Sequence, residues 1–285
     1  MSRIKAPAGT LYVVATPIGN FDDIGKRAIE TLRSVDLIAA EDTRHTGLLL
    51  KHLAIPTSMV SLHEHNEDRK TQLLIDRIEA GDSVALVSDA GTPLISDPGY
   101  RLVKAAHGAG LRVSPLPGPC ALIAGLSVAG VATDRFTFEG FLPSAGSARR
   151  RTLRSLVEER RTMVFYESPR RVLNSLADMA EIFGDNRPTA ICREITKHYE
   201  TIRSATLATL LEEHGKADQM ARGEYVLVVG GNTLPMDETC RTEWVEAVCE
   251  LRSVMPLKRA ARIISGVTGV SSQLLYRLAE ETGSE

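Results

Sequence analysis

The sequence predicts an α/β fold with two α/β domains, the first built on a parallel sheet and the second on a mixed sheet, followed by a small helical C-terminal extension. In the first part of the chain, short apolar runs alternate with segments whose apolar residues recur at helical spacing, which is typical of a parallel sheet with helices on both faces. Near Thr133 the strands become longer and more polar, which favours a mixed sheet. Beyond the second domain, the apolar residues recur only at helical spacing. The predicted domains are 1–134, 135–232 and 233–285.

Each element of the first domain follows from local composition, because apolar runs indicate buried strands and apolar residues three or four apart indicate helices. Strands are predicted at 11–16, 36–40, 84–87 and 112–116. Helices are predicted at 24–35, around Leu48 to Leu53, around Leu73 to Ile78 and at 102–109. Small residues at 121, 124, 125 and 129 then predict a slim helix that packs closely against its neighbours.

The second domain and the tail are predicted in the same way. The expected strands lie at 136–143, 162–168, 188–196 and 223–231, and the expected helices at 147–160 and 169–183. Residues 232–238 are typical of a linker. Two short helices follow, through Leu257 and through Leu274, and a glycine-containing turn joins them with Ser271 or Ser272 as the N-cap. This pair resembles a helix-turn-helix.

Bulk properties narrow the functional class. The chain has 285 residues, a formal net charge of −2 and 43% hydrophobic residues, so any contact with nucleic acid must come from local basic patches. No apolar run is long enough to cross a bilayer, and the N-terminus has no secretory signal. Cys120, Cys192, Cys240 and Cys249 lack the spacing of a zinc site. We expect a cytoplasmic protein with reduced thiols, no bound metal and no membrane contact.

Three loops at predicted strand ends are candidates for a ligand site. They are TPIGN (16–20), SDAGTP (88–93) and LPGPCA (116–121), and in a doubly wound sheet they would converge on one crevice. Glycine allows close backbone approach and proline makes the bends rigid. Each loop alone could be an ordinary tight turn. The chain lacks the glycine-rich motif of dinucleotide-binding folds and that of P-loop nucleotidases.

In this order and spacing, the three loops resemble the ligand loops of the tetrapyrrole methylase superfamily, whose members bind S-adenosylmethionine between two α/β domains. Further stretches resemble one family within it, the ribosomal RNA small-subunit methyltransferases I. They are AEDTRHTGLLL (40–50), SLHEHNE (61–67), VFYESPRR (164–171), CREITKHYE (192–200) and GEYVLVV (223–229). The resemblance implies 2′-O-methylation of a cytidine ribose in the decoding centre of 16S rRNA, with S-adenosylmethionine as cofactor. It also implies a homodimer.

The resemblance assigns the cofactor contacts by position. They fall on Pro17, Asp89, Ala90, Gly91, Thr92, Pro93, Pro117, Gly118, Pro119, Cys120, Ala121, Tyr166 and Glu167. A carboxylate such as Asp89 suits a cationic sulfonium, although a loop-capping role is the alternative.

The catalytic candidates are Glu41, Asp42, Arg44 and Lys197. Methyl transfer is an in-line displacement that depends on alignment. A ribose hydroxyl also needs a base or nearby cations, and an acid pair beside a cation could supply them. The alternative for the first three is a solvated turn with a surface salt bridge. The identity of the base stays open, with His63, Glu64, His65 and Glu194 also considered.

Contacts to RNA require cations that neutralise phosphates. The candidates are His63, His65, Arg149, Arg150, Arg151, Arg170, Arg171, Lys258, Arg259 and Arg262. The alternatives are solvated helix faces and, for the tail, a small packing appendage. The resemblance implies 16S rRNA as the substrate. Because the phosphates of a folded RNA are spread over its surface, we expect the assembled small ribosomal subunit to be a better substrate than bare RNA. A tetrapyrrole or other small-molecule methyltransferase and a non-enzymatic nucleic-acid-binding regulator remain the rival functions.

Overall fold

The structure is a computed structural model, and it describes residues 7–63, 65–214, 222–233 and 242–282. Contacts divide the chain into two compact units. The first comprises Met1–Arg154 with Arg161–Gly230, and the second comprises Ser155–Arg160 with Gly231–Glu285. The division into three domains stays a prediction.

The first sheet is entirely parallel, as predicted, and its strands follow the order β3-β2-β4-β1-β5 among the described residues. All residues of β2 and β4 are buried, because helices cover both faces of the sheet. The strands are β1 (Thr10–Val14), β2 (Leu37–Ala40), β3 (Met59–Ser61), β4 (Val84–Val87) and β5 (Arg112–Leu116).

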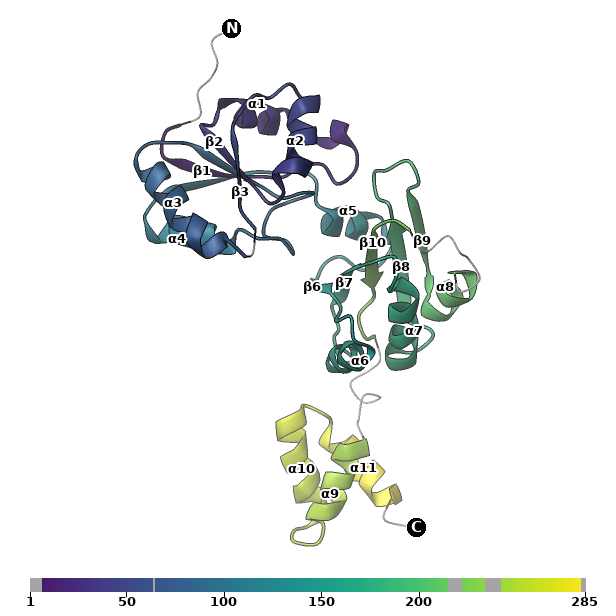
Figure 1. Cartoon of the computed structure of the whole chain (residues 1–285). Coiled ribbons are helices and arrows are strands. Elements are labelled where there is room, and N and C mark those ends of the chain that lie inside the picture. The colour runs from purple at the N-terminus through teal and green to yellow at the C-terminus, as the bar shows by residue number, and fades with distance from the viewer. Residues whose placement is uncertain (1–6, 64, 215–221, 234–241, 283–285) are drawn as a thin grey trace. The chain divides into compact units, whose positions relative to one another are not determined.

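Helices cover the two faces of this sheet in pairs (Figure 1). On one face, Val14 packs in a cluster with Leu32 of α1 (Lys26–Ser34) and Leu49 of α2 (Thr43–His52). On the other face, Leu11 packs with Leu74 of α3 (Glu67–Glu79) and Leu102 of α4 (Tyr100–Gly108). Alternate residues of β1 therefore serve opposite faces, as the two-residue repeat of a strand requires.

The strand order creates a switch point between β1 and β4. The chain leaves β1 toward α1 on one face and leaves β4 toward α4 on the other. Ligand crevices in open α/β sheets form where neighbouring strands diverge in this way. The carboxyl ends of β1 and β4 are therefore where a site is expected.

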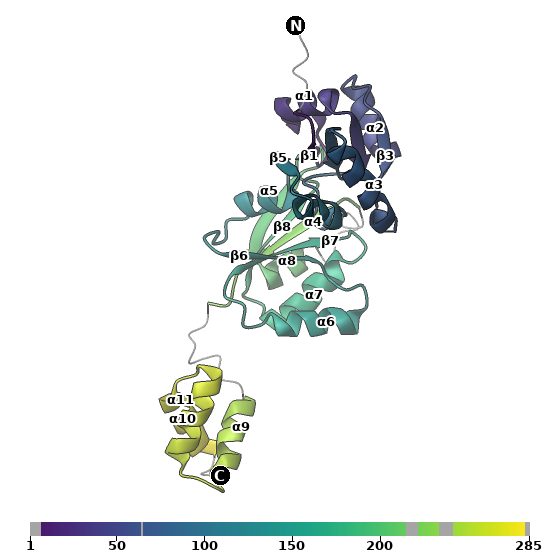
Figure 2. The ribbon, with the colours of Figure 1, turned by 90° about the vertical axis from the view of Figure 1, so that its left-hand side faces the viewer.

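The second sheet is mixed, as predicted, and has the order β6-β7-β10-β8-β9 among the described residues. Strands β6 and β7 pair in parallel, whereas the other pairs are antiparallel. The strands are β6 (Phe136–Phe141), β7 (Thr162–Glu167), β8 (Pro188–Arg193), β9 (Thr201–Thr206) and β10 (Tyr225–Val229). Figure 2 shows α6 (Gly146–Ser155), α7 (Val172–Phe183) and α8 (Leu207–His214) beside this sheet.

The predicted slim helix is α5 (Ala121–Val128), which joins the two sheets. It follows β5 of the first sheet, and its Leu122 and Leu126 pack in one cluster with Val226 of the second sheet. A Cβ atom added at Gly125 would lie 2.9 Å from Val226 Cγ1, so glycine is what permits this close approach. Gly125 therefore lets α5 pack directly against the second sheet.

Several predicted boundaries are wrong. The helix predicted at 147–160 ends at Ser155, and the one predicted at 169–183 begins at Val172. Strand β9 was not predicted, because the polar, largely exposed TIRSAT segment has no apolar alternation. Helix α8 was also missed, although Leu207 and Leu210 recur at helical spacing. Strand β3 was missed because it has only three residues.

The tail has a third described helix, α9 (Thr242–Leu251), before the two that were predicted. Its apolar residues recur at helical spacing, so the signal was present in the sequence. Helices α10 (Leu257–Thr268) and α11 (Ser272–Thr282) are joined at Gly269, which adopts the left-handed conformation of a C-cap. The Ser271 hydroxyl accepts a hydrogen bond from the Leu274 N–H at 3.5 Å, which makes Ser271 the N-cap. The three helices share one apolar core.

Two further predictions concern cysteines and membranes. Cys120, Cys192 and Cys249 are free thiols, whereas Cys240 and most of the predicted linker lie outside the described residues. Among the described helices, none combines the length and apolar character needed to span a bilayer.

Candidate active site

The three predicted loops meet at the switch point. The Thr16 N–H donates to the Gly91 carbonyl at 2.9 Å, and the Gly91 N–H donates back to the Thr16 carbonyl at 3.1 Å. The Thr92 hydroxyl donates to the Pro119 carbonyl at 3.0 Å, which adds the third loop. The prediction that these loops converge on one crevice is confirmed.

Glycine is required at two of these bends. Gly91 has φ +82°, a conformation that side chains disfavour, and an added Cβ would lie 3.4 Å from Ile18 Cγ2. At Gly118 an added Cβ would lie 3.0 Å from the Cβ of Ala15. The close approach that the sequence predicted for these glycines is therefore toward the neighbouring loop.

The ends of β2 and β4 are linked by two carboxylates. The Asp89 carboxylate accepts a hydrogen bond from the Asp42 N–H at 3.0 Å. In return, the Glu41 carboxylate accepts one from the Asp89 N–H at 3.4 Å. This exchange holds Glu41 and Asp89 on the same wall of the crevice.

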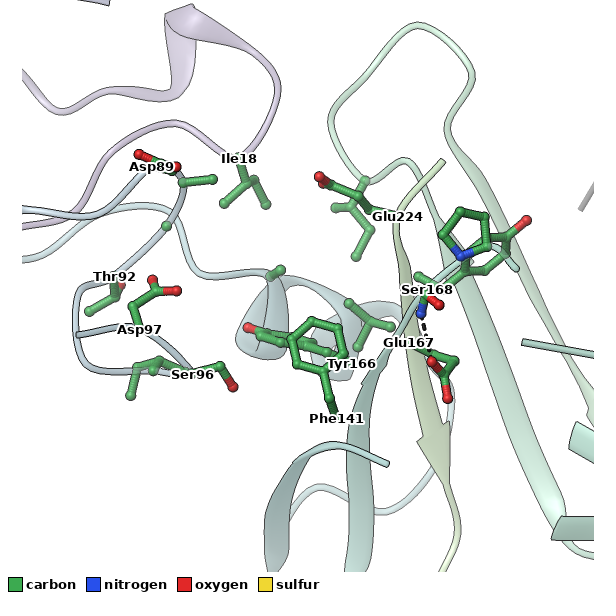
Figure 3. A pocket seen from close by; sticks show the side chains of 18 of the residues that line it. Ile18, Asp89, Thr92, Ser96, Asp97, Phe141, Tyr166, Glu167, Ser168 and Glu224 are labelled. Atoms are coloured by element: carbon green, nitrogen blue, oxygen red, sulfur yellow. Dashed lines mark hydrogen bonds between the residues drawn. The ribbon is translucent and has the colours of Figure 1, made fainter. Parts of the chain in front are cut away.

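A cavity of about 360 Å³ opens beside the three loops, within the first unit. Five of the described residues that line the cavity carry carboxylates. No lysine or arginine is among the described lining residues. Figure 3 shows Asp89, Thr92 and Asp97 on one side, with Tyr166 and Phe141 facing them. The described lining residues are Ile18, Glu41, Asp89, Ala90, Gly91, Thr92, Ile95, Ser96, Asp97, Ala121, Phe141, Tyr166, Glu167, Ser168, Pro169, Ile195, Glu224, Tyr225 and Val226.

An aromatic cluster forms the wall contributed by the second sheet. The rings of Phe138 and Phe141 meet the Tyr166 ring edge-on, at centroid distances of 4.9 and 5.6 Å. The Tyr166 hydroxyl accepts a hydrogen bond from the Leu122 N–H at 3.0 Å, at the start of α5. Burial raises the pKa of Tyr166, so this phenol stays neutral. Phe141 leaves 55% of its surface exposed and offers a stacking face at the mouth.

Asp97 is a cavity residue that the sequence predictions missed. It lies in the loop after Gly91, where Leu94 and Ser96 have φ values of +74° and +68°. Burial raises the pKa of Asp97 to about 6, and the nearby Asp89 carboxylate adds to the rise. Non-glycine residues in left-handed conformations are costly and gather at functional loops. The available signal was the acid in SDPGY, which follows the SDAGTP loop after two residues.

Glu167 was predicted to contact the cofactor, but its carboxylate is bonded within the protein. The side chain is completely buried. It accepts hydrogen bonds from the Ser168 N–H at 2.7 Å and the Ser175 hydroxyl at 2.6 Å, and it pairs with Arg171 at 2.8 Å. Glu167 therefore fastens the start of α7 to β7 and contributes to the cavity only as part of its wall.

A second hollow of about 260 Å³ adjoins the first and shares Ile18, Asp89, Ala90 and Glu224 with it. Pro17 and Lys197, both predicted site residues, line this second hollow together with His45. The cleft therefore has one acidic compartment and one that contains a cation.

Lys197 is held between two carboxylates. Its ammonium lies 2.9 Å from Glu194 Oε1 and 2.8 Å from Glu224 Oε2. Burial opposes the charge, but the bonds to Glu224 and Glu194 prevail and raise the pKa of Lys197. The stem of Lys197 passes Gly19, where an added Cβ would lie 2.3 Å from Lys197 Cγ. Lys197 is thus a fixed cation and a poor candidate for a base.

Asp42 and Arg44 do not line either hollow. Asp42 is the N-cap of α2 and pairs with Arg44 at 2.8 Å, while the Arg44 side chain is 91% exposed. The hydrogen bond from Arg44 lowers the pKa of Asp42 and makes it a weak base. The alternative for this segment, a solvated turn with a surface salt bridge, is what the structure contains, and only Glu41 faces the cavity.

Five of the predicted cofactor residues line neither hollow. They support the loops through the Thr92–Pro119 bond and the contact between Gly118 and Ala15. These residues are Pro93, Pro117, Gly118, Pro119 and Cys120.

The predicted arginine cluster divides into buried and exposed members. Arg149 is 6% exposed and pairs with Asp178 at 2.6 Å, which favours a structural role over the predicted RNA contact. Arg150 makes a second bond to Asp178 at 3.3 Å. Arg171, paired with Glu167, also donates to the Leu142 carbonyl at 3.1 Å, and its side chain is only 25% exposed.

Cations remain exposed on other parts of the predicted surface. Arg151 and Arg170 are exposed in the first unit. In the tail, α10 exposes Lys258, Arg259 and Arg262 on the side opposite its buried alanines. These residues are available for phosphate contacts.

His63 and His65 lie outside both hollows. The His63 ring is 2.9 Å from the amide nitrogen of Asn66 and 6.0 Å from the His65 ring. Glu64 lies outside the described residues. Within the described ranges, no three acidic, histidine or cysteine side chains gather as a metal would need.

Comparison with known proteins agrees with this geometry. The model of the Tetrapyrrole (Corrin/Porphyrin) Methylases matches residues 10–211. A solved diphthine synthase superposes with a TM-score of 0.59 at 16% identity, covering 79% of this chain and 91% of its own. Uroporphyrin-III-C-methyltransferase from Thermus thermophilus gives 0.52 at 20% identity, covering 78% and 94%. The fold and site thus define a tetrapyrrole methylase.

Similarity to curated proteins identifies one family among the tetrapyrrole methylases. Ribosomal RNA small subunit methyltransferase I of Pseudomonas aeruginosa is 50% identical over 273 residues, covering 95% of this chain and 97% of the relative. The protein of the same name from Escherichia coli O157:H7 is 47% identical over 273 residues, covering 96% and 95%. The chain belongs to the ribosomal RNA small subunit methyltransferase I family.

Proposed function

We propose that this chain is an S-adenosylmethionine-dependent methyltransferase that methylates the 2′-hydroxyl of a cytidine ribose in 16S rRNA of the small ribosomal subunit. The observation that carries the proposal is the acid-lined cavity at the switch point, whose described wall contains five carboxylates and no lysine or arginine. S-adenosylmethionine carries a cationic sulfonium and an ammonium group, and a negative wall attracts both. Relatives named for methylation of small-subunit rRNA support the choice of substrate.

The residues present fit this cofactor. Asp89 would face the cationic sulfonium, and the backbone of the 89–93 loop would bond the polar parts. Ile18 and the Tyr166–Phe141 pair offer apolar contact for the adenine ring. When bound, the cofactor supplies an activated methyl group, and the protein contributes alignment and charge.

The RNA would contact the exposed cations. Arg151, Arg170, Lys258, Arg259 and Arg262 are exposed, and each could neutralise a phosphate. Arg150, His63 and His65 stay candidates for the same role. Because the exposed cations belong to two compact units, we favour a folded RNA surface within the small subunit over bare RNA.

The proposal includes two further expectations. The resemblance to the superfamily favours a homodimer, which sedimentation of the purified protein would test. A ribosomal substrate implies that the protein works in the cytoplasm.

Calorimetric titration with S-adenosylmethionine, followed by transfer of a radiolabelled methyl group to small subunits, tests the proposed function. We expect saturable cofactor uptake, and mass spectrometry should locate the new methyl group on a cytidine ribose of 16S rRNA. Naked 16S rRNA serves as the comparison and should react more slowly. Absence of cofactor uptake, or transfer to a porphyrinoid instead of RNA, would overturn the proposal.

The role of the tail is tested by deleting residues 233–285. If the tail binds RNA, the deletion weakens binding to small subunits and reduces the dependence of log affinity on log salt. Replacing Lys258, Arg259 and Arg262 by alanine in the full chain should reduce the slope by about one for each phosphate that is no longer neutralised. Unchanged affinity and slope in both proteins would leave the tail without an RNA role.

A further inference from the structure

The proposed reaction needs a proton acceptor, and the cavity limits where one can be. A ribose hydroxyl is a weak nucleophile until its proton moves to a base within hydrogen-bonding distance. In the described cavity wall, the strongest candidates are the five carboxylates of Glu41, Asp89, Asp97, Glu167 and Glu224.

Four of the five carboxylates are already bonded to other groups of the protein. Glu167 receives hydrogen bonds from Ser168 and Ser175 and an ion pair from Arg171. Glu224 pairs with Lys197 at 2.8 Å. Asp89 and Glu41 accept the backbone bonds that join β2 to β4. These contacts hold the four carboxylates in place as part of the protein wall.

Asp97 differs from the other four carboxylates. Among the described residues, Asp97 takes part in no ion pair and accepts no backbone hydrogen bond from another strand, and the Ser88 side chain is its polar neighbour. Its carboxylate faces the Tyr166 hydroxyl across the cavity in Figure 3. Asp97 also contributes electrostatically to the rise in the Tyr166 pKa, so the two groups lie close enough to interact. An acid in this position is directed at the ligand space.

The loop that carries Asp97 is held at both ends. At its start, Gly91 is bonded to Thr16 in both directions. At its end, the buried Glu67 carboxylate accepts hydrogen bonds from the Gly99 N–H at 3.1 Å and the Arg101 N–H at 2.9 Å. Between these points, Leu94 and Ser96 adopt left-handed backbone conformations. Strain that the surroundings maintain is a means of presenting a side chain in a fixed direction.

The electrostatic environment gives Asp97 the base strength that neutral pH requires. Burial raises the pKa of Asp97 to about 6, the Ser88 side chain offsets part of the rise, and Asp89 adds to it. The neutral phenol of Tyr166 faces it from β7, and Glu41 lies on the same wall as Asp89. A general base works best when its pKa lies near the working pH, because it is then ionised and still attracts a proton.

We propose that Asp97 is the general base that accepts the proton of the ribose 2′-hydroxyl; this inference rests on the proposed function. The Asp97 carboxylate takes the hydroxyl proton as the hydroxyl oxygen bonds to the methyl carbon of the sulfonium donor. The carbon–sulfur bond breaks, and its electron pair stays on sulfur as a neutral thioether. Asp97 then releases the proton to solvent, so charge and atoms balance.

The test compares Asp97→Asn with unmodified protein and with Asp134→Asn, the same change at an exposed position outside the cavity. Single-turnover methyl transfer to small subunits gives the rate, and calorimetry gives S-adenosylmethionine affinity. A general base contributes about 10²–10⁴-fold, so we expect Asp97→Asn to lose at least about 100-fold in rate. Cofactor Kd should change less than about threefold, and Asp134→Asn should match unmodified protein.

A pH series adds a readout that a structural role would not change. The rate of unmodified protein should fall about tenfold per pH unit below the pKa of the base, whereas residual Asp97→Asn activity should lack this limb. A rate within about threefold of the unmodified protein, or a loss confined to cofactor affinity, would overturn the role of Asp97. Failure of the unmodified protein to methylate small subunits would instead overturn the proposed function, and the Asp97 role with it.

Discussion

Replacing Arg149 by methionine tests whether this arginine belongs to the protein core or to an RNA surface. The Arg149 Nε atom lies 2.6 Å from Asp178 Oδ2, and the two side chains are 8% and 10% exposed. Removing one partner of a buried ion pair costs about 3–5 kcal/mol, because the other charge is left without compensation. Arg150 keeps its bond to Asp178 at 3.3 Å, so we expect the lower end, about 3 kcal/mol.

Thermal unfolding measures this loss of stability. For a unit of about 150–250 residues, each kcal/mol lowers Tm by about 2–4 °C, so Arg149→Met should melt about 6–12 °C below unmodified protein. Arg151→Met is the matched control, because Arg151 lies in the same helix and is exposed. It should keep Tm within about 2 °C and, if it contacts a phosphate, reduce the salt slope of RNA binding by about one.

The opposite pattern would refute the reasoning. If Arg149→Met kept the Tm of unmodified protein while RNA binding lost salt dependence, Arg149 would be a phosphate contact and the pairing with Asp178 incidental. A double-mutant cycle with Asp178→Asn separates the pair energy from the loss of side-chain packing.

Four further substitutions test other parts of the molecule. Gly125→Val should destabilise the protein by about 1–3 kcal/mol in urea unfolding, because a Cβ there meets Val226 Cγ1 at 2.9 Å; an unchanged midpoint would contradict this packing. The pKa of Asp97 is raised to about 6 from an ordinary 3.8, which means that the folded state binds this proton more tightly than the unfolded state does. The stabilisation from proton binding at Asp97 is therefore complete below about pH 4 and is lost as the pH rises through 6. Because Asp97 is only partly buried and solvent screens its charge, we expect an effect of about 1 kcal/mol. Asp97→Asn should therefore melt roughly 2–4 °C above unmodified protein at pH 8 and show no gain at pH 4, and a gain at both pH values would contradict the assignment. Glu41→Gln and Lys197→Ala should each lower turnover far more than cofactor affinity, as steady-state kinetics and calorimetry would show, and equal losses of both would argue against a catalytic role.

Much of the fold could be predicted because its signals are local. The VALV and YVLVV runs predict buried strands, and the bends after them contain the glycines and prolines that such turns need. Strand β9 could not be predicted in this way, because its exposed TIRSAT residues depend on pairing with β8 for their conformation. Local composition therefore predicts buried elements better than edge elements.

The candidate site also has parts that local sequence predicts and parts that it does not. The three loops were predicted from their residues and spacing, and the structure joins them through Thr16, Gly91 and Thr92. Asp97 was missed, although it stands in the most informative stretch of the chain, because nothing in its immediate sequence distinguishes it from a loop acid. The position of Asp97 opposite Tyr166, a residue of the other sheet, becomes visible only in the folded protein.

Neighbouring residues along the chain are enough to specify where the buried strands end, which bends need glycine, and to which family the loops are similar. The roles of the charged side chains become visible only in the folded molecule. Arg149 is buried against Asp178, Glu167 is bonded to Ser175, and Asp97 faces an acid-lined cavity. This difference arises because the energy of a charge depends on its burial and on the partners that distant segments bring to it, and folding alone sets both.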